Sequence, residues 1–297
     1  MTTPRFDLPE PARRTGRRPR LLDLFCCAGG AATGYQRAGF DVVGVDIAPQ
    51  PNYPFEFHLA DALEFVAEHG SRFDAIHASP PCQGYLNLGA VNRALKREYN
   101  HPDLIAATRE LLIRTGLPYV IENVQDARKQ LIAPVRICGT GLGRPLRRHR
   151  LFESNVPLGG VACAHDRFTE PKYWTGWRPG GERRLSTVVQ VYGNAGGREH
   201  WAEAMGMDWA TDKEMAEAVP PSYTEHLGRQ LLATIHPKAC NETRCQAPGC
   251  RTSITQPGTG RPRRFCCGAC RVRHHRTARH GGTPSPLARS TPKGTRR

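Results

Sequence analysis

The sequence predicts an α/β fold built on a Rossmann-like doubly wound sheet. Short apolar runs alternate with helical segments, a loop of small residues follows the first run, and several runs end in acidic or reactive side chains. At 297 residues, with 39% hydrophobic residues, the chain is long enough for one such domain and an appendage. We expect this domain over 20–153, an irregular insertion over 154–197 and a return of the chain to the domain over 198–237.

Hydropathy argues against a membrane protein. The chain contains no run of about 18 uncharged apolar residues, and its arginine-rich beginning lacks the apolar core of a signal peptide. We therefore expect a cytoplasmic protein whose cysteines stay reduced. We also expect a monomer.

The formal charge of +15 is concentrated at the two ends of the chain. Residues 1–20 contain six arginines and two acidic residues, and residues 238–297 contain fourteen basic residues and one glutamate. Basic ends on a near-neutral core favour a polyanionic partner that is bound through its phosphates, the alternative being solubilising tails. The segments 1–19 and 277–297 are expected to be disordered.

The first expected strand, at 21–25, leads into a loop of small residues at 26–34 and a helix through Ala38. Small residues in this position let a ligand approach the backbone at a helix N-terminus, although a plain tight turn gives the same pattern. The second strand, at 42–46, ends in Asp46. Such a carboxylate is placed to accept hydrogen bonds from ribose hydroxyls, unless it is an ordinary turn or cap residue.

The next two strand ends also carry functional groups. Asp61 follows a short third strand and precedes an expected helix at 62–69, whose N-terminus it is able to cap. The run at 74–83 ends in two prolines and Cys82, so the chain leaves the sheet there as a stiff loop. An exposed thiol at a strand end is a candidate nucleophile, whereas a buried structural cysteine is the alternative.

Further along, a basic segment at 84–100 precedes an amphipathic helix at 103–115 and a strand at 117–121. Glu122 follows this strand, and because the carboxyl ends of such strands share one crevice, it is expected near Cys82. Four basic residues occupy 147–150 before another strand begins at 151. The period-two spacing of Arg148 and Arg150 directs both side chains to one face of an extended chain. One helix is expected over 201–217, and another over 224–235.

Ser79-Pro80-Pro81-Cys82-Gln83 resembles the catalytic motif of the DNA cytosine-5 methyltransferases, and six of that family's principal motifs occur in the family's order between about 20 and 235. The others include Asp-Leu-Phe at 23–25, Glu122-Asn123-Val124, the arginines near 150 and Pro-Pro-x-Tyr at 220–223. The resemblance implies a class I S-adenosylmethionine-dependent methyltransferase with a mixed sheet. The resemblance is to the bacterial or phage type of the family, which includes restriction-modification enzymes.

The resemblance also implies residue roles. Cys82 would add to a cytosine flipped out of double-stranded DNA, and Glu122 would protonate the ring, with Arg148 and Arg150 beside it. Asp46 would bind the ribose of S-adenosylmethionine, and Asp61 its adenine amino group. The full set of expected cofactor-binding residues is Asp23, Phe25, Gly29, Gly30, Asp46, Asp61, Ala62, Pro80 and Val219.

Three positions depart from the family's pattern, namely Cys27, Leu86 and Leu146. Cys27 stands where the family usually has a loop glycine, and its side chain would narrow the cofactor pocket. By position, 154–197 is the family's target-recognition region and 84–100 its mobile loop. Two alternatives remain open: an enzyme of the same fold that methylates RNA of the tRNA type, and a nucleic-acid-binding protein with a lapsed active site.

Six of the eleven cysteines lie between Cys240 and Cys270. Cys245 and Cys250, then Cys266 and Cys270, form two pairs that flank a loop of glycine, proline and arginine. In a reducing compartment this spacing predicts a module over 240–276 that holds a structural Zn²⁺. Arg264-Phe265-Cys266 and Cys270-Arg271-x-Arg273 resemble a small zinc-ribbon or treble-clef type, which implies a final helix that begins at the second cysteine pair. Rival ligands are Cys240, Cys267, His274 and His275.

Overall fold

The computed structural model describes residues 17–81, 104–177, 180–193, 198–235, 242–255 and 263–279. The chain forms two compact units, Met1–Ile235 and His236–Arg297, called here the main unit and the tail unit. Cys82, the basic segment at 84–100 and most of the two ends predicted to be disordered lie outside the described residues.

The main unit is built on a seven-stranded sheet in the order β3-β2-β1-β4-β5-β7-β6. The first five of these are parallel to one another, and β7 is antiparallel to both β5 and β6. The strands are β1 (Arg20–Leu24), β2 (Asp41–Asp46), β3 (Glu56–Leu59), β4 (Ala75–Ala78), β5 (Tyr119–Asn123), β6 (Val135–Cys138) and β7 (His149–Ser154). The predicted doubly wound, mixed sheet is therefore confirmed.

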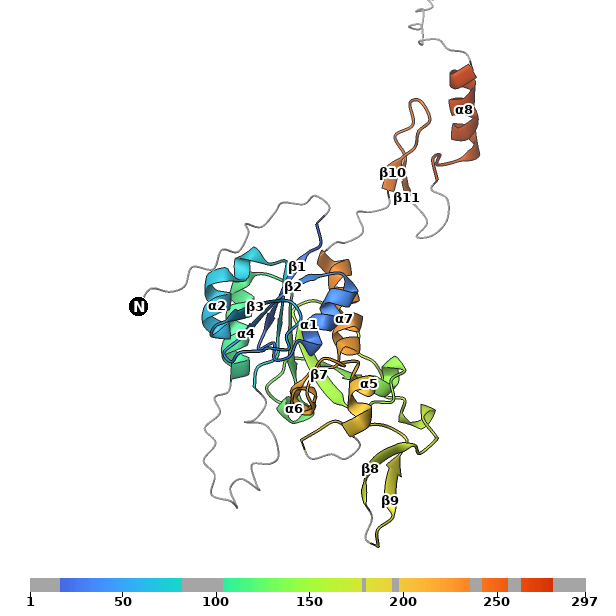
Figure 1. The fold of residues 1–297 in the computed structure, drawn as a ribbon. Helices are drawn as coiled ribbons and strands as arrows, with labels where there is room; N and C mark the ends of the chain where they lie inside the picture. The colour runs from blue at the N-terminus through green and yellow to red at the C-terminus, as the bar shows by residue number, and fades with distance from the viewer. Residues whose placement is uncertain are drawn as a thin grey trace, which may run out of the picture. The chain divides into compact units, whose positions relative to one another are not determined.

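Helices cover both faces of this sheet, as Figure 1 shows. One face packs against α1 (Gly30–Ala38) and α7 (Pro221–Ile235), and the other against α2 (Ala62–His69) and α4 (Leu104–Thr115). The central strand β1 is buried along its whole length, because a parallel strand between two helical layers has no solvent-facing side. Its alternate leucines contribute to the cores on both faces.

The contact between α1 and α7 brings the end of the main unit back to its beginning. A Cβ added at Gly34 would lie 2.0 Å from Thr224 Oγ1, so the two helices approach too closely for any larger residue. The Thr224 hydroxyl donates a hydrogen bond of 2.8 Å to Ala31 O. This packing holds Val219, which directly precedes the Pro-Pro-x-Tyr motif, beside the loop after β1.

One expectation about local structure was wrong, and one strand was missed. The predicted single helix at 201–217 is two helices, α5 (Trp201–Met205) and α6 (Asp212–Glu217). Gly206 ends the first with a φ of 74°, and Thr211 begins the second with a capping box to Glu214. Strand β6 was not predicted, because its alternation over four residues is too short to recognise.

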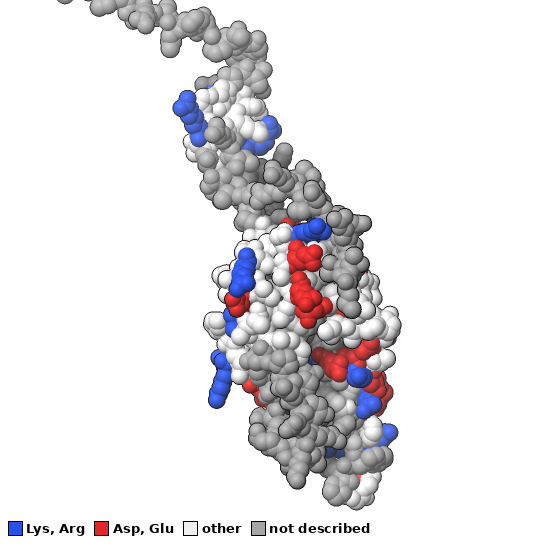
Figure 2. Space-filling view, turned by 90° about the vertical axis from the view of Figure 1, so that its left-hand side faces the viewer, with Lys and Arg blue, Asp and Glu red and all other residues white. Residues whose placement is uncertain are grey.

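The region predicted to be irregular, 154–197, contains a hairpin of β8 (Tyr173–Trp177) and β9 (Arg183–Ser186). On the face of the main unit shown in Figure 2, acidic side chains gather, with basic side chains at separate positions around them. This fits the slight excess of acidic residues that the sequence has between its two ends. None of the described helices combines the length and the apolar character that crossing a bilayer requires.

The tail unit consists of a short hairpin and a helix. The hairpin pairs β10 (Glu242–Arg244) with β11 (Ser253–Thr255), and α8 spans Gly268–Arg279. The expected helix at the second cysteine pair is thus confirmed, but it continues three residues beyond the boundary expected at 276.

Candidate functional site

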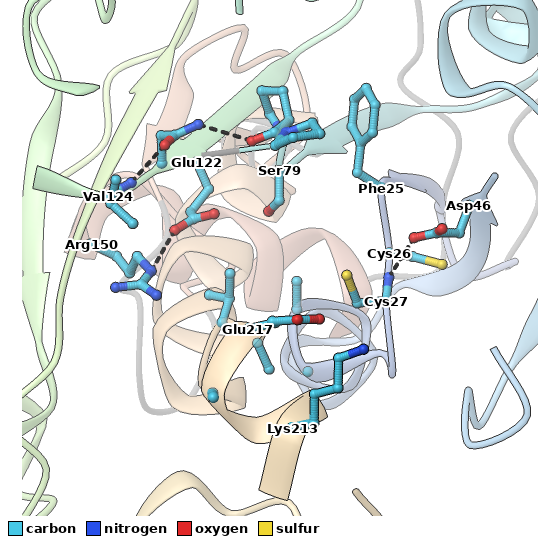
Figure 3. A pocket seen from close by; sticks show the side chains of 18 of the residues that line it. Phe25, Cys26, Cys27, Asp46, Ser79, Glu122, Val124, Arg150, Lys213 and Glu217 are labelled. Carbon is cyan, nitrogen blue, oxygen red and sulfur yellow. Dashed lines mark hydrogen bonds and ion pairs between the residues drawn. The ribbon is translucent and has the colours of Figure 1, made fainter. Parts of the chain in front are cut away.

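A cavity of about 560 Å³ opens at the carboxyl ends of β1, β2, β4 and β5 (Figure 3). The strand order reverses between β1 and β4, and in open α/β sheets the crevice outside such a switch point is where ligands bind. The cavity volume lies in the range of about 300–1,000 Å³ that is typical of small-molecule sites. The predicted site residues that line it are Asp23, Phe25, Gly30, Asp46, Pro80, Glu122, Arg150 and Val219.

The loop after β1 is held by the carboxylate at the end of β2. Asp46 Oδ2 accepts a hydrogen bond of 3.1 Å from Cys27 N, and Oδ1 accepts one of 3.0 Å from Ala48 N. Phe25 and Cys27 have φ angles of 59° and 43°, which few residues other than glycine adopt. Such backbone conformations cluster at ligand sites, where the surrounding structure stabilises them.

Gly30 forms the closest contact between this loop and the returning chain. A Cβ added there would lie 2.4 Å from Val219 O and 3.0 Å from Met207 Sδ, so only glycine fits. Gly29 has a φ of 78° and packs on the ring of Tyr53 instead, outside the cavity lining. Trp209 Nε1 donates to Ala28 O at 2.9 Å, which adds a second tie between the loop and the chain around α6.

Asp23 places a buried carboxylate under the cavity. The residue is 0% exposed, and neither oxygen accepts a hydrogen bond of normal geometry from any residue that the structure describes. Burial raises the pKa of Asp23 well above its usual range, and the neighbouring Asp46 raises it further, while the Ala32 backbone N–H acts in the opposite direction. A buried carboxyl of this kind is costly to retain without a ligand partner.

Two thiols also line the cavity, and neither is a reactive thiolate. Burial and then the charge of Asp46 raise the pKa of Cys27 to about 12. Burial, followed by the charge of Asp23, raises the pKa of Cys26 as well. Because only the thiolate is a good nucleophile, neither side chain fits a nucleophilic role.

Glu122 and Arg150 form a buried ion pair at the other end of the cavity, drawn in Figure 3. Glu122 Oε1 lies 2.9 Å from Arg150 Nε, and both side chains are largely buried. Burial raises the pKa of Glu122, while Arg150, a hydrogen bond from Ser79 and Arg148 lower it in that order, and the net shift is upward. A carboxyl group with a raised pKa is suited to donate a proton near neutral pH.

The loop after β4 is fixed beside this pair. Asn123 Nδ2 donates a hydrogen bond of 3.0 Å to Pro80 O, and Asn123 Oδ1 accepts one of 2.9 Å from Val124 N. Asn123 therefore joins the ends of β4 and β5. Pro81, whose successor in the sequence is Cys82, lines the cavity.

A chain of buried hydrogen bonds extends from Ser79 away from the cavity. Ser79 Oγ lies 3.0 Å from His77 Nε2, and His77 Nδ1 lies 3.1 Å from the Tyr35 hydroxyl. Burial lowers the pKa of His77 to about 3, so its imidazole is neutral and has one donor and one acceptor nitrogen. When Tyr35 donates to Nδ1, Nε2 donates to Ser79, whose hydroxyl hydrogen is then directed to Glu122.

Three predicted site residues lie outside the cavity lining besides Gly29. Asp61 caps α2 by accepting hydrogen bonds of 2.8 and 3.0 Å from Leu63 N and Glu64 N, and Ala62 begins that helix. Arg148 is buried and donates to the backbone oxygens of Val191, Ala216 and Ala218. It thus fastens the chain around α6 to β7, and it does not face the cavity as Arg150 does.

Known proteins resemble this chain in sequence and in fold. No protein-family model matches the chain. It is 26% identical over 243 residues to the type II methyltransferase M.XorII of Xanthomonas oryzae pv. oryzae, which covers 71% of this chain. The chain spans about half (53%) of the length of that curated relative.

Among solved structures, the methyltransferase EhMeth of Entamoeba histolytica aligns with a TM-score of 0.50 and 12% identity over 74% of this chain and 99% of that one. A prophage-encoded E. coli protein, provisionally described as a DNA modification methyltransferase, aligns with a TM-score of 0.47 and 13% identity over 74% of this chain and 100% of that one. The fold is that of class I S-adenosylmethionine-dependent methyltransferases.

One wall of the cavity in this methyltransferase fold was not predicted from the sequence. It is formed by the chain around α6, which contributes charged residues opposite Ser79 and Glu122 (Figure 3). Only Val219 had been expected from this part of the chain. The additional lining residues are Gly193, Arg198, Asp212, Lys213, Ala216, Glu217 and Ala218.

In the tail unit, the structure brings together the four cysteines that were expected to bind metal. The sulfurs of Cys245, Cys250, Cys266 and Cys270 all lie within 4.8 Å of one another. Cys266 Sγ is 3.7 Å from Cys250 Sγ and 3.4 Å from Cys270 Sγ, close to the separation of about 3.8 Å between thiolates on one tetrahedral zinc ion. The rivals His274 and His275 instead pack near Phe265, and Cys240 lies outside the described residues.

Proposed function

We propose that this protein transfers a methyl group from S-adenosylmethionine to carbon 5 of cytosine in double-stranded DNA. The observation that carries the proposal is that the buried pair of Glu122 and Arg150 opens onto the same cavity as the loop after β1, with Pro81 at its edge. One cavity thus joins a site for a cofactor to a carboxyl group with a raised pKa, next to the segment that leads to Cys82.

The cofactor would occupy the part of the cavity between the ends of β1 and β2. Gly30 permits close approach to the backbone, Asp46 has carboxylate lone pairs in reach of the cavity, and the buried oxygens of Asp23 accept no hydrogen bond of normal geometry from the described residues. These features fit a ligand that carries hydroxyl groups and positive charge. When bound there, S-adenosylmethionine supplies an electrophilic methyl group.

The chain's own residues would make cytosine reactive. The Cys82 thiolate adds to carbon 6 while Glu122 donates a proton to N3, so that carbon 5 gains the electron density of an enamine. After carbon 5 has taken the methyl group, its proton passes to a base and the sulfur–carbon bond breaks, which restores the double bond between carbons 5 and 6. N3 returns its proton to Glu122, and the Cys82 thiolate leaves. Arg150 holds Glu122 in place throughout, and Ser79 orients its carboxyl group.

Double-stranded DNA is the proposed partner, and the reacting carbon of a cytosine lies inside the duplex. The base has to be flipped out of the stack, at a cost of a few kcal/mol, before a cavity of this kind receives it. The basic ends of the chain would supply phosphate contacts, and the region 154–197 with its β8–β9 hairpin is the proposed recognition region. The protein would act as a monomer, alone or with a restriction enzyme.

In the tail unit we propose a structural Zn²⁺ held by Cys245, Cys250, Cys266 and Cys270. Among the described residues of this unit, those that are buried are Cys245, Ala247, Ile254 and Cys270, which is too small a core to fold without a metal. Arg271 and Arg273 of α8 are exposed and would contact phosphates without regard to sequence.

The deciding experiment measures transfer of tritiated methyl groups to duplex DNA and, separately, to tRNA. Transfer to DNA that is abolished in Cys82→Ala, with S-adenosylmethionine binding retained, is the expected result. Transfer to tRNA alone would establish the RNA alternative, and binding of nucleic acid without transfer to either would indicate a lapsed active site. Equal turnover by Cys82→Ala would refute the covalent mechanism.

A further inference from the structure

Four metal-ligating side chains meet in the main unit, away from the cavity. They are Cys138 at the end of β6, His149 at the start of β7, and Cys163 and His165 in the segment that follows β7. One ligand atom from each lies within 4.8 Å of the ligand atoms of the other three. No single stretch of the sequence carries more than two of these residues, so the fold is what assembles the group.

The spacing of these atoms fits one tetrahedral ion. Cys138 Sγ lies 3.3 Å from His165 Nε2, and Cys163 Sγ lies 3.2 Å from His149 Nε2. Bond lengths of about 2.3 Å from zinc to sulfur and about 2.0 Å to nitrogen place such atoms about 3.5 Å apart on a tetrahedron. Two thiolates and two imidazoles are a ligand set that zinc commonly takes in structural sites.

Thiol-to-imidazole hydrogen bonds would explain each of these pairs, but they do not require the two pairs to converge.

The surroundings also suit a thiolate at Cys138. Thr140 Oγ1 lies 3.2 Å from Cys138 Sγ and accepts a hydrogen bond of 3.2 Å from Ala164 N. Its own hydroxyl hydrogen is therefore left to donate to the sulfur, as groups around metal ligands typically do.

The segment after β7 has no core of its own. The structure describes all of residues 155–172, and none of them is buried. Apart from a single 3₁₀ turn, His165–Arg167, the segment has no helix or strand. Its first part is anchored by Val156, Leu158 and Val161, which pack against the core of the main unit. A metal ion would in addition anchor Cys163 and His165, which lie beyond this apolar contact.

We propose that Cys138, His149, Cys163 and His165 form a structural zinc site that fixes the beginning of the region 154–197 to the β6–β7 hairpin. Four protein ligands leave no open coordination position, which is typical of structural rather than catalytic zinc. Successive residues of a strand point to opposite faces, so His149 would bind the ion on one face of β7 while Arg150 faces the cavity on the other. The site would therefore brace the strand that carries Arg150.

The test counts metal in full-length protein in which the tail cluster has been removed by Cys245→Ser and Cys250→Ser. This background separates the new site from the zinc proposed for the tail unit. We expect about one zinc per chain by mass spectrometry in this background, and loss of that zinc when Cys163→Ser and His165→Ala are added. Cys27→Gly, which removes a thiol of the cavity, is the matched control and keeps the zinc.

Cobalt gives a second measurement that requires no change to the cluster. Co²⁺ bound to the tail-disrupted protein should show the absorption bands of a tetrahedral ion with thiolate charge transfer, even if the Cys163 variant fails to fold. A folded tail-disrupted protein that binds neither metal would overturn the proposal. Retention of the zinc after both Cys163→Ser and His165→Ala would do the same.

Discussion

Arg150 Nε lies 2.9 Å from Glu122 Oε1 in a part of the cavity where both side chains are largely buried. The arginine alone would keep the carboxyl ionised, but burial outweighs it and the pKa of Glu122 is raised. The pair thus orients the carboxyl group by a strong contact and still leaves its proton available. This balance is what a general acid for the cytosine ring requires.

Replacing Glu122 tests the proposed acid directly. Glu122→Gln preserves the size of the side chain and removes the proton donor, so methyl transfer should fall by about 10² to 10⁴-fold. Binding of S-adenosylmethionine, measured by calorimetry, should change little because the carboxyl group lies at the other end of the cavity. Asp126→Asn, at an acidic residue in the 3₁₀ turn just after β5, is the control, and activity of Glu122→Gln equal to that of the control would contradict the role.

The hydrogen bond from Ser79 gives a prediction about pH. A general acid works while it is protonated, so activity should fall as pH rises through the raised pKa of Glu122. Ser79 lowers that pKa, and Ser79→Ala should therefore move the alkaline fall in kcat/KM to higher pH. Thr33→Ala, at another buried hydroxyl outside the cavity lining, should leave the profile in place. A profile of Ser79→Ala shifted to lower pH would contradict the assignment.

Much of the site could be predicted because it lies at strand ends. Asp46 and Glu122 each follow a short apolar run, and the rule that parallel strands share a crevice at their carboxyl ends placed them together. The wall around α6 could not be predicted in this way. Lys213 and Glu217 are ordinary charged residues of a short helix. The packing of α7 on α1, together with the hydrogen bonds of Trp209 and Arg148, brings that part of the chain to the cavity.

The Cys138, His149, Cys163 and His165 cluster was missed for a related reason. In the sequence, Cys163 and His165 offer two ligands at close spacing, which is too few to indicate a metal site. The other two ligands come from adjacent antiparallel strands, where Cys138 pairs with His149. Strand β6 was not predicted, so nothing in the sequence placed this pair beside the other.

Asp23 gives a prediction about stability. Its pKa is raised by folding, so the native state binds the proton more tightly than the unfolded chain does. The free energy of unfolding should therefore fall as pH rises from about 4 to the raised pKa, by about 1.4 kcal/mol per pH unit, and level off above it. Asp23→Asn should unfold at a higher temperature than the wild type at pH 8 and lose this advantage near pH 4.

The same variant tests the cofactor site. If Asp23 offsets positive charge on S-adenosylmethionine, the ligand should raise the unfolding temperature of Asp23→Asn less than that of the wild type. Asp74→Asn, a carboxylate that accepts a hydrogen bond from Arg20 N, is the control for the loss of an aspartate. In the pH experiment, equal pH dependence of stability in Asp23→Asn and the wild type would show that burial does not raise the pKa of Asp23.

Cys27 stands at a position where the backbone favours glycine. Its φ of 43° costs an L-residue about 1–2 kcal/mol, part of which glycine loses again through its greater freedom in the unfolded chain. Cys27→Gly should therefore keep or slightly raise the unfolding temperature. It should also bind S-adenosylmethionine at least as tightly, because the cavity widens. Cys26→Gly, at a buried core position, is the control and should lower the unfolding temperature. Weaker cofactor binding by Cys27→Gly would show that the Cys27 thiol contributes to the cofactor site.

The tail unit should affect nucleic-acid affinity and not the choice of target. Cys270→Ser removes a buried ligand of the proposed zinc site, so the variant should lose one zinc and the fold of the tail unit. Since the exposed arginines of α8 would then no longer be held toward phosphates, affinity should fall equally for all DNA sequences, and the dependence of log Kd on log salt should become shallower. Cys267→Ser, at an exposed cysteine outside the cluster, should retain both the zinc and the affinity. Unchanged affinity and salt dependence in a zinc-free Cys270→Ser protein would show that the tail unit does not contact DNA, whatever metal it binds.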